Sequence, residues 1–306
     1  MLEFLREQGV DEGILKEVEK FRDTYPAEAG SESRMVKAPK YLYYGREVWE
    51  QALTAVLCGE NLLLTGSKAT GKNVLAENLA AVFGRPQWNL SFHINMDASY
   101  MIGTDTFLGG QVTFRPGPVY QAAAQGGFCI LDEINMARNE ALAVLHSVLD
   151  FRRTIDVPGY DSLSVHPAAR FIATMNYGYA GTRDLNEALA SRFVVIQTPE
   201  MSQDNLTRLL GKMFPDLTSS ARGQFAALFG DIAKKSASGE ISLRPLDLRG
   251  LFDSLRLMRA GLAPRQALDM GITNKTFDAA ERAMVEDVIS SRIPESVKSS
   301  SLFEAR

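Results

Sequence analysis

The sequence is poor in the residues that build disulfide scaffolds and zinc sites. It has two cysteines and three histidines among 306 residues. Cys58 and Cys129 lie within apolar segments, so we expect small core residues rather than a disulfide or a metal-binding pair. The histidines are far apart and lack the spacing of zinc ligands. These scarcities predict a protein of the reducing cytoplasm.

Long apolar runs and charge of one sign are also scarce. No stretch approaches the roughly 20 apolar residues that a membrane span needs, and the charged start at 1–7 is unlike a signal peptide. The net charge is −4 and the pI is near 5.6, which argues against a dedicated nucleic-acid binder. With 45% hydrophobic and 23% charged residues, the chain has the composition of an ordinary globular protein. Its length allows two domains and a sizeable core.

What the sequence does contain is a phosphate-binding loop, Gly-Ser-Lys-Ala-Thr-Gly-Lys-Asn, at residues 66–73. An apolar strand at 61–65 precedes the loop, and apolar residues at helical spacing follow it as far as Gly84. This order of strand, glycine-rich turn and helix predicts binding of a nucleoside triphosphate. The predicted contacts are backbone groups and side chains of Gly66, Ser67, Lys68, Ala69, Thr70, Gly71, Lys72, Asn73 and Val74.

The rest of the chain divides by its periodicity. Residues 1–40 predict an N-terminal helical extension and linker. Residues 41–200 alternate strands and helices, which predicts an α/β core with a parallel sheet. Within this part we expect an irregular stretch before Gly110, a helix over 141–149 and a hairpin over 153–166. Residues 201–306 have helical periodicity only and predict an α-helical lid domain.

Polar residues at the ends of two predicted strands complete a candidate site. Asp132 and Glu133 follow the apolar run 128–131, where Asp132 would hold Mg²⁺ through water and Glu133 would orient and deprotonate the attacking water. Asn176 ends the strand that begins at Phe171 and could place its amide near the γ-phosphate. On local grounds alone, the carboxylates could instead be solvated and Asn176 a plain turn residue.

Two arginines are candidates for the transition-state charge. Arg192 ends a predicted helix just before a strand, from where it could reach the γ-phosphate of a neighbouring subunit. Arg244 precedes Pro245, and a proline in a first helical turn would leave Arg244 at a helix start, facing the nucleotide. Arg249 competes for the same role. The alternative is that these arginines stabilise helix ends or lie on the surface.

Together these residues resemble the AAA+ ATPases, and more narrowly their MoxR-type, dynein-related branch. The resemblance covers about residues 45–260. Beyond the phosphate loop it is carried by Met101-Ile102-Gly103-Thr104, Val112–Pro118, Leu131–Ala137, Ala173–Asn176, Leu185–Leu189 and Ser191-Arg192-Phe193. It implies a parallel five-stranded sheet between helices, with a C-terminal helical lid.

The resemblance also implies roles for the candidates. Lys72 corresponds to the Walker A lysine, Asp132 and Glu133 to the Walker B pair, and Asn176 to sensor 1. Arg192 corresponds to the arginine finger, acting in trans, and Arg244 to sensor 2. ATP and Mg²⁺ would bind at the interfaces of a ring of copies, usually a hexamer. Many relatives remodel or activate a partner protein, often beside one with a von Willebrand factor A domain, and the 101–118 insert and the 153–166 hairpin would face the pore or partner.

One residue departs from the family pattern. Asn73 stands where Ser or Thr normally gives a hydroxyl oxygen to Mg²⁺. An amide oxygen can also ligate a hard cation, so we expect binding to survive and hydrolysis to be slowed or tuned. This leaves two alternatives to an ATP-driven remodelling subunit: a nucleotide-gated scaffold with slow hydrolysis, and an NTP-driven nucleic-acid motor or restriction-type GTPase subunit. The lack of a basic cluster weighs against the second.

Overall fold

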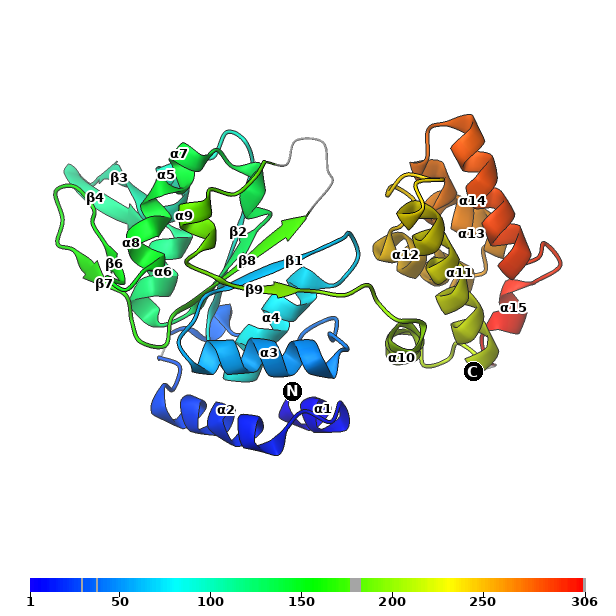
Figure 1. Ribbon diagram of the computed structural model, residues 1–306, viewed down its shortest axis with the longest axis horizontal. Helices are drawn as coiled ribbons and strands as arrows, with labels where there is room; N and C mark the ends of the chain where they lie inside the picture. The colour runs from blue at the N-terminus through cyan, green and yellow to red at the C-terminus, as the bar shows by residue number, and fades with distance from the viewer. Residues whose placement is uncertain (29, 37, 177–182, 305–306) are drawn as a thin grey trace. The chain divides into compact units, whose positions relative to one another are not determined.

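The computed structural model describes residues 1–28, 30–36, 38–176 and 183–304 (Figure 1). Contacts divide the chain into two compact units. The first comprises Met1–Ser67 and Gly71–Pro199, and the second Lys68–Thr70 and Glu200–Arg306.

The first unit is built on a five-stranded parallel sheet with the order β2-β5-β8-β1-β9. The strands are β1 (Leu62–Gly66), β2 (Gln87–Ser91), β5 (Phe128–Asp132), β8 (Arg170–Asn176) and β9 (Val194–Gln197). This confirms the predicted fold class. Because all five strands run the same way, their carboxyl ends meet at one edge of the sheet. There β8 lies between β1 and β5, and this order brings together motifs that are far apart in the sequence.

Helices cover both faces of the sheet (Figure 1). One core contains Leu62 and Leu64 of β1 and lies under α3 (Arg46–Leu57) and α4 (Lys72–Phe83). The other contains Leu63, whose side chain points the opposite way, as alternation along a strand requires. It is closed by the short helices α5 (Ala98–Ile102), α6 (Pro118–Gln125), α7 (Asn139–Leu142), α8 (His146–Leu149) and α9 (Glu187–Ala190).

The N-terminal extension shares the core of the first unit. It forms α1 (Leu2–Glu7) and α2 (Glu12–Thr24), whose apolar side chains are buried with those of α3 and α4. Arg22 donates hydrogen bonds to the carbonyls of Ala81 and Val82 in the last turn of α4. The extension therefore stabilises the far end of the helix that begins at the phosphate loop. A short 3₁₀ turn (Glu32–Arg34) follows α2.

Three local predictions differ from the structure. The stretch before Gly110, expected to be irregular, includes α5 and the hairpin of β3 (Gly103–Leu108) with β4 (Gln111–Pro116). Its turn is Gly109-Gly110, both at positive φ, as a two-residue hairpin turn of type I′ requires. The helix expected at 141–149 is interrupted by a 3₁₀ segment (Ala143–Leu145) between α7 and α8. Cys58 is exposed after α3, whereas Cys129 is buried in β5 as expected.

The predicted 153–166 hairpin is present as β6 (Thr154–Ile155) and β7 (Leu163–Ser164). It contacts the β3–β4 hairpin. The Tyr160 hydroxyl donates to Asp105, with 2.7 Å between the oxygens, and the Tyr160 ring lies 5.2 Å from that of Phe114. The two hairpins thus form one projection, on which Phe107 and Val112 are exposed.

The second unit is helical. It consists of α10 (Gln203–Met213), α11 (Ser219–Ala237), α12 (Leu248–Arg259), α13 (Pro264–Gly271), α14 (Ala279–Arg292) and α15 (Ser299–Leu302), with a 3₁₀ turn at Thr273–Lys275. Four of these helices start at a capping side chain, from Ser202, Thr218, Asp247 and Asp278. Within the described part of the whole chain, no helix has the length and apolarity to cross a membrane.

Candidate functional site

The phosphate loop connects β1 to α4 through backbone conformations that favour glycine. Gly66, Ala69 and Gly71 all have positive φ. At Gly71 a Cβ atom would also lie only 3.1 Å from the ring of Tyr43, so this position needs glycine for both conformation and space. The loop winds around Lys72, whose ammonium donates to the carbonyls of Gly66 at 2.9 Å and Ser67 at 2.7 Å.

Lys72 is the central charge of this loop. Its side chain is buried, with 6% of the residue exposed. Burial lowers the pKa of Lys72 to about 8, and the negative charges of Asp132 and Glu133 act against this shift. The positive charge of the Lys72 ammonium therefore interacts with both carboxylates at the tip of β5.

The two acidic residues are held by a buried threonine of the neighbouring strand. The Thr174 hydroxyl donates to Asp132 Oδ1 at 2.7 Å and accepts the backbone N–H of Glu133 at 3.0 Å. Thr174 is only 1% exposed, so its hydroxyl depends on these two partners. The pairing of Leu131 with Ala173 puts Thr174 beside Asp132. Sequence reasoning missed Thr174, although its place two residues before Asn176 puts both on the same side of β8.

Glu133 has an unusual backbone conformation. Its φ of 56° is in the left-handed region, which is unfavourable for a non-glycine residue. Its side chain is exposed, and the Asn176 amide donates to its Oε1 at 3.0 Å. Behind it, Asn135 in the 3₁₀ turn Ile134–Met136 donates to the Asn176 carbonyl at 3.1 Å. Asn135, also missed from the sequence, joins the Glu133 turn to the end of β8.

The structure thus brings four predicted residues to one edge of the sheet: Lys72, Asp132, Glu133 and Asn176. Gly66 at the end of β1 pairs with Asn176, and the hydrogen bonds above connect Asn176 to Glu133. Asn73 lies in the first turn of α4 with its side chain exposed. The oxygens of Asp132 and Asn73 are donors of the kind that hard cations prefer, so the residues present fit a bound Mg²⁺.

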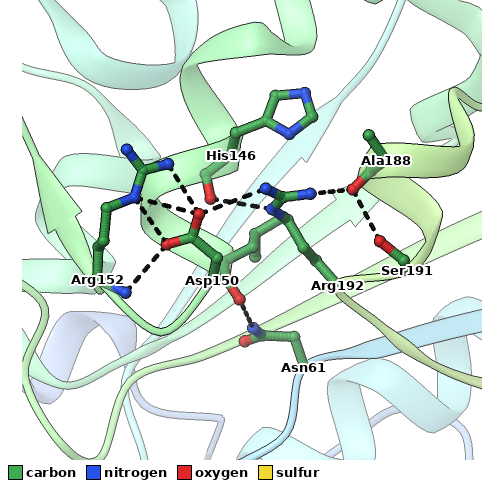
Figure 2. Close-up of polar contacts among 8 residues, drawn as sticks. Asn61, His146, Asp150, Arg152, Ala188, Ser191 and Arg192 are labelled. Carbon is green, nitrogen blue, oxygen red and sulfur yellow. Dashed lines mark hydrogen bonds and ion pairs between the residues drawn. The ribbon is translucent and has the colours of Figure 1, made fainter.

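Arg192 lies at the opposite end of the strands, where they begin. It precedes β9, and Val194 of β9 pairs with Leu62 at the start of β1, so the length of β1, roughly 15 Å, separates this end from Gly66. Its guanidinium donates to the carbonyls of His146, at 3.2 Å, and Ala188, and to Asp150 at 3.4 Å (Figure 2). Arg192 therefore does not join the Lys72 site of its own chain.

Arg244 and Arg249 belong to the second unit. The predicted helix start at Pro245 is wrong, because α12 begins at Leu248. Asp247 caps this helix by accepting the backbone N–H of Arg249 at 3.0 Å. Arg244 is exposed in the preceding loop, with its guanidinium 5.3 Å from the centre of the Phe277 ring. Arg249 lies in the first turn of α12.

Comparison with known proteins agrees with this geometry. Residues 61–193 match the AAA domain family, dynein-related subfamily. The chain is 34% identical over 243 residues to the uncharacterised protein YojN of Bacillus subtilis, covering 78% of this chain and 79% of YojN. The chain belongs to the AAA+ family, in its dynein-related subfamily. The matched region of this AAA+ chain runs from the residue before β1 to the residue before β9, and so contains the phosphate loop, the tips of β5 and β8, and Arg192.

Two further matches concern coverage and fold. The uncharacterised protein SSP1341 of Staphylococcus saprophyticus is 32% identical, with 81% of this AAA+ chain and 97% of that protein covered. A solved structure from Cytophaga hutchinsonii covers 95% of this chain and 98% of its own, at 13% identity and a TM-score of 0.47. A likeness at that score adds no weight to the family assignment, which depends on the sequence matches.

Proposed function

We propose that this AAA+ chain binds and hydrolyses ATP with Mg²⁺, as one subunit of a homo-oligomeric ring, and uses the cycle to remodel or activate a partner protein. The observation that carries the proposal is the meeting of Lys72, Asp132, Glu133 and Asn176 at the carboxyl edge of the sheet. Ligands of open α/β sheets bind at this edge.

Each residue has a role in this proposal. Lys72 leaves the loop carbonyls and donates to the β- and γ-phosphates, while the loop N–H groups and the start of α4 bind the remaining oxygens. Asp132 and Asn73 hold Mg²⁺, which neutralises phosphate charge when bound. Glu133 accepts the proton of the attacking water. Asn176 fixes the Glu133 carboxylate through Oε1 and leaves Oε2 for that water.

Arg192 acts in trans in this proposal. Its place at the far edge of the sheet keeps it from its own Lys72 site, whereas the planar guanidinium is suited to the charge that develops on a γ-phosphate. This is the reason for proposing a ring in which each subunit lends Arg192 to the next. In the same proposal, Arg244, with Arg249 as the competing candidate, contacts the nucleotide from the second unit.

The proposed partner is a protein. The projection formed by the two hairpins exposes Phe107 and Val112, and the net charge of −4 disfavours a nucleic-acid substrate. We propose a cytoplasmic location and, from the family resemblance, a von Willebrand factor A domain protein among the partners. A pull-down with Glu133→Gln, which should retain ATP, tests this against Glu133→Gln carrying Phe107→Ser. DNA-stimulated hydrolysis would instead favour the nucleic-acid motor.

A slow, nucleotide-gated scaffold is the second candidate, because Asn73 replaces the usual hydroxyl ligand of Mg²⁺. Phosphate release by the purified protein separates the two. The remodelling subunit requires steady turnover that Glu133→Gln abolishes and that Glu140→Gln, an exposed carboxylate on α7, leaves unchanged. Equal phosphate release by wild type and Glu133→Gln would contradict hydrolysis at this site.

A further inference from the structure

The carboxylate of Asp150 is shared by two arginines (Figure 2). Arg152 contacts both of its oxygens, with Nε at 3.1 and 3.2 Å and a terminal nitrogen 2.8 Å from Oδ2. Arg192 contacts the same Oδ2 from the other side at 3.4 Å. The Asp150 side chain is 11% exposed and that of Arg192 24%, so the contact is screened less than a surface ion pair.

Three contacts from different segments fix the plane of the Arg192 guanidinium. His146 of α8 and Ala188 of α9 provide backbone carbonyls, and Asp150, directly after α8, provides the only charged partner among the described residues. These contacts use one N–H on each of the three guanidinium nitrogens. Two N–H groups then have no partner in the described part of the chain, and these can be presented to an incoming oxyanion.

The residue before Asp150 is anchored to the sheet. The Asn61 amide donates to the carbonyl of Leu149 at 3.3 Å and accepts the backbone N–H of Phe171 at 3.2 Å. The backbone carbonyl of Asn61 accepts the N–H of Val194, at the start of β9, at 2.8 Å. One buried residue, Asn61, therefore ties Leu149, the residue before Asp150, to β8 through its side chain and to the start of β9 through its backbone carbonyl. A rigid base of this kind is what a positioning contact needs.

We propose that Asp150 is a positioning residue for Arg192, which holds the guanidinium ready for the triphosphate of the neighbouring subunit. This inference rests on the proposed function, in which Arg192 acts in trans. Arg152 in turn orients the Asp150 carboxylate by contacting both of its oxygens. The hydrogen bond from Arg152 is the largest reason why the pKa of Asp150 is lowered to about 2, so the carboxylate stays charged at any working pH.

The test is Asp150→Asn, with phosphate release measured against ATP concentration. The substitution keeps the size of the side chain and removes its charge, so Arg192 loses its ion pair and keeps only the two carbonyl contacts that orient it. We expect kcat to fall roughly ten- to a hundredfold with KM unchanged, since misplacing a catalytic group has effects of this order. Arg192→Ala should fall further, by about a thousandfold. Asp231→Asn is the matched control, because Asp231 pairs with Arg292 at 2.7 Å outside this site and its loss should leave turnover unchanged.

A mixing experiment separates positioning from a general structural role. Lys72→Ala subunits bind no ATP but carry an intact Arg192, so in excess they should restore turnover to the intact sites of Asp150→Asn subunits. Arg192→Ala subunits should be rescued in the same way. If Asp150→Asn does not assemble, Asp150→Glu keeps the charge for Arg152, displaces it by one methylene, and should show a smaller fall in kcat with the same rescue.

The failures of the two ideas are distinguishable. Two results would overturn the role of Asp150 and leave the proposed function intact. One is wild-type turnover in Asp150→Asn or Asp150→Glu. The other is that Lys72→Ala subunits rescue Arg192→Ala but do not rescue the Asp150 variants. An Arg192→Ala protein that hydrolyses ATP like the wild type would instead remove the trans arginine from the proposed function, and with it the basis of the inference.

Discussion

Replacing Thr174 by valine should damage stability and turnover together. The Thr174 hydroxyl is the common partner of Asp132 and the Glu133 backbone, at 2.7 and 3.0 Å. Valine has nearly the same volume but no hydroxyl, so Asp132 loses a donor and the Glu133 N–H loses its acceptor. A hydrogen bond to a charged group contributes about 1.5–3 kcal/mol, and an unsatisfied buried N–H costs about 1–3 kcal/mol. Because both contacts are only partly buried, we take about 2 kcal/mol for the pair.

For a unit of about 200 residues, that loss lowers the melting temperature by about 4–8 °C. Turnover should fall about tenfold, because the proposed Mg²⁺ ligand Asp132 and the proposed general base Glu133 both lose their support. Circular dichroism melting and steady-state phosphate release measure the two effects. Thr174→Ser is the control, since it keeps the hydroxyl and should retain most of the turnover. A valine variant as stable and active as the wild type, or a serine variant equally impaired, would refute the reasoning.

Three further predictions concern other parts of the first unit. The pKa of Lys72 is about 8 in the free protein. The negative charge of a bound triphosphate should raise this pKa, so that Lys72 takes up a proton on binding. ATP affinity should then be constant below pH 8 and fall up to tenfold per pH unit above it. Titration calorimetry at pH 8 in buffers of different ionisation enthalpy should detect the proton uptake. Equal heats of binding in all buffers would contradict this prediction. Asn73→Thr should raise kcat several-fold by supplying a hydroxyl ligand to Mg²⁺, and loss of turnover would mean that Asn73 is an adapted ligand. Arg85 is 1% exposed and donates to four carbonyls, including those of Tyr25 and Pro26 in the N-terminal extension. Arg85→Leu should therefore lower the free energy of unfolding by about 3 kcal/mol or more. An unchanged urea midpoint would show that these contacts of the extension do not stabilise the fold.

The residues predicted from the sequence are those whose role can be inferred from a short, continuous stretch of the chain. The phosphate loop is one continuous segment, and Asp132 and Glu133 directly follow the apolar run of β5. Local patterns of this kind need no knowledge of which strands are neighbours. The parallel sheet followed from the same alternation of strands and helices.

The missed features depend on register or lie on the surface. Thr174 and Asp132 are 42 positions apart and meet only because β5 pairs with β8. Asp150 and Arg192 are also 42 positions apart and meet only in the folded chain. The β3–β4 hairpin has few buried residues, so its strands lack the apolar alternation of a core strand, although Gly109-Gly110 was a usable turn signal. At α12, the capping side chain of Asp247 determines the helix start, and Pro245 does not.

The central claim is that a Mg²⁺-bound triphosphate lies between the Lys72 loop and the Asp132–Glu133 tip of β5. Isothermal titration of the purified chain with Mg²⁺ and ATP tests it most directly, with Lys72→Ala and Glu133→Gln titrated alongside. We predict one nucleotide per chain, retained in Glu133→Gln and lost in Lys72→Ala. No heat with either ATP or GTP, or undiminished binding by Lys72→Ala, would contradict the claim.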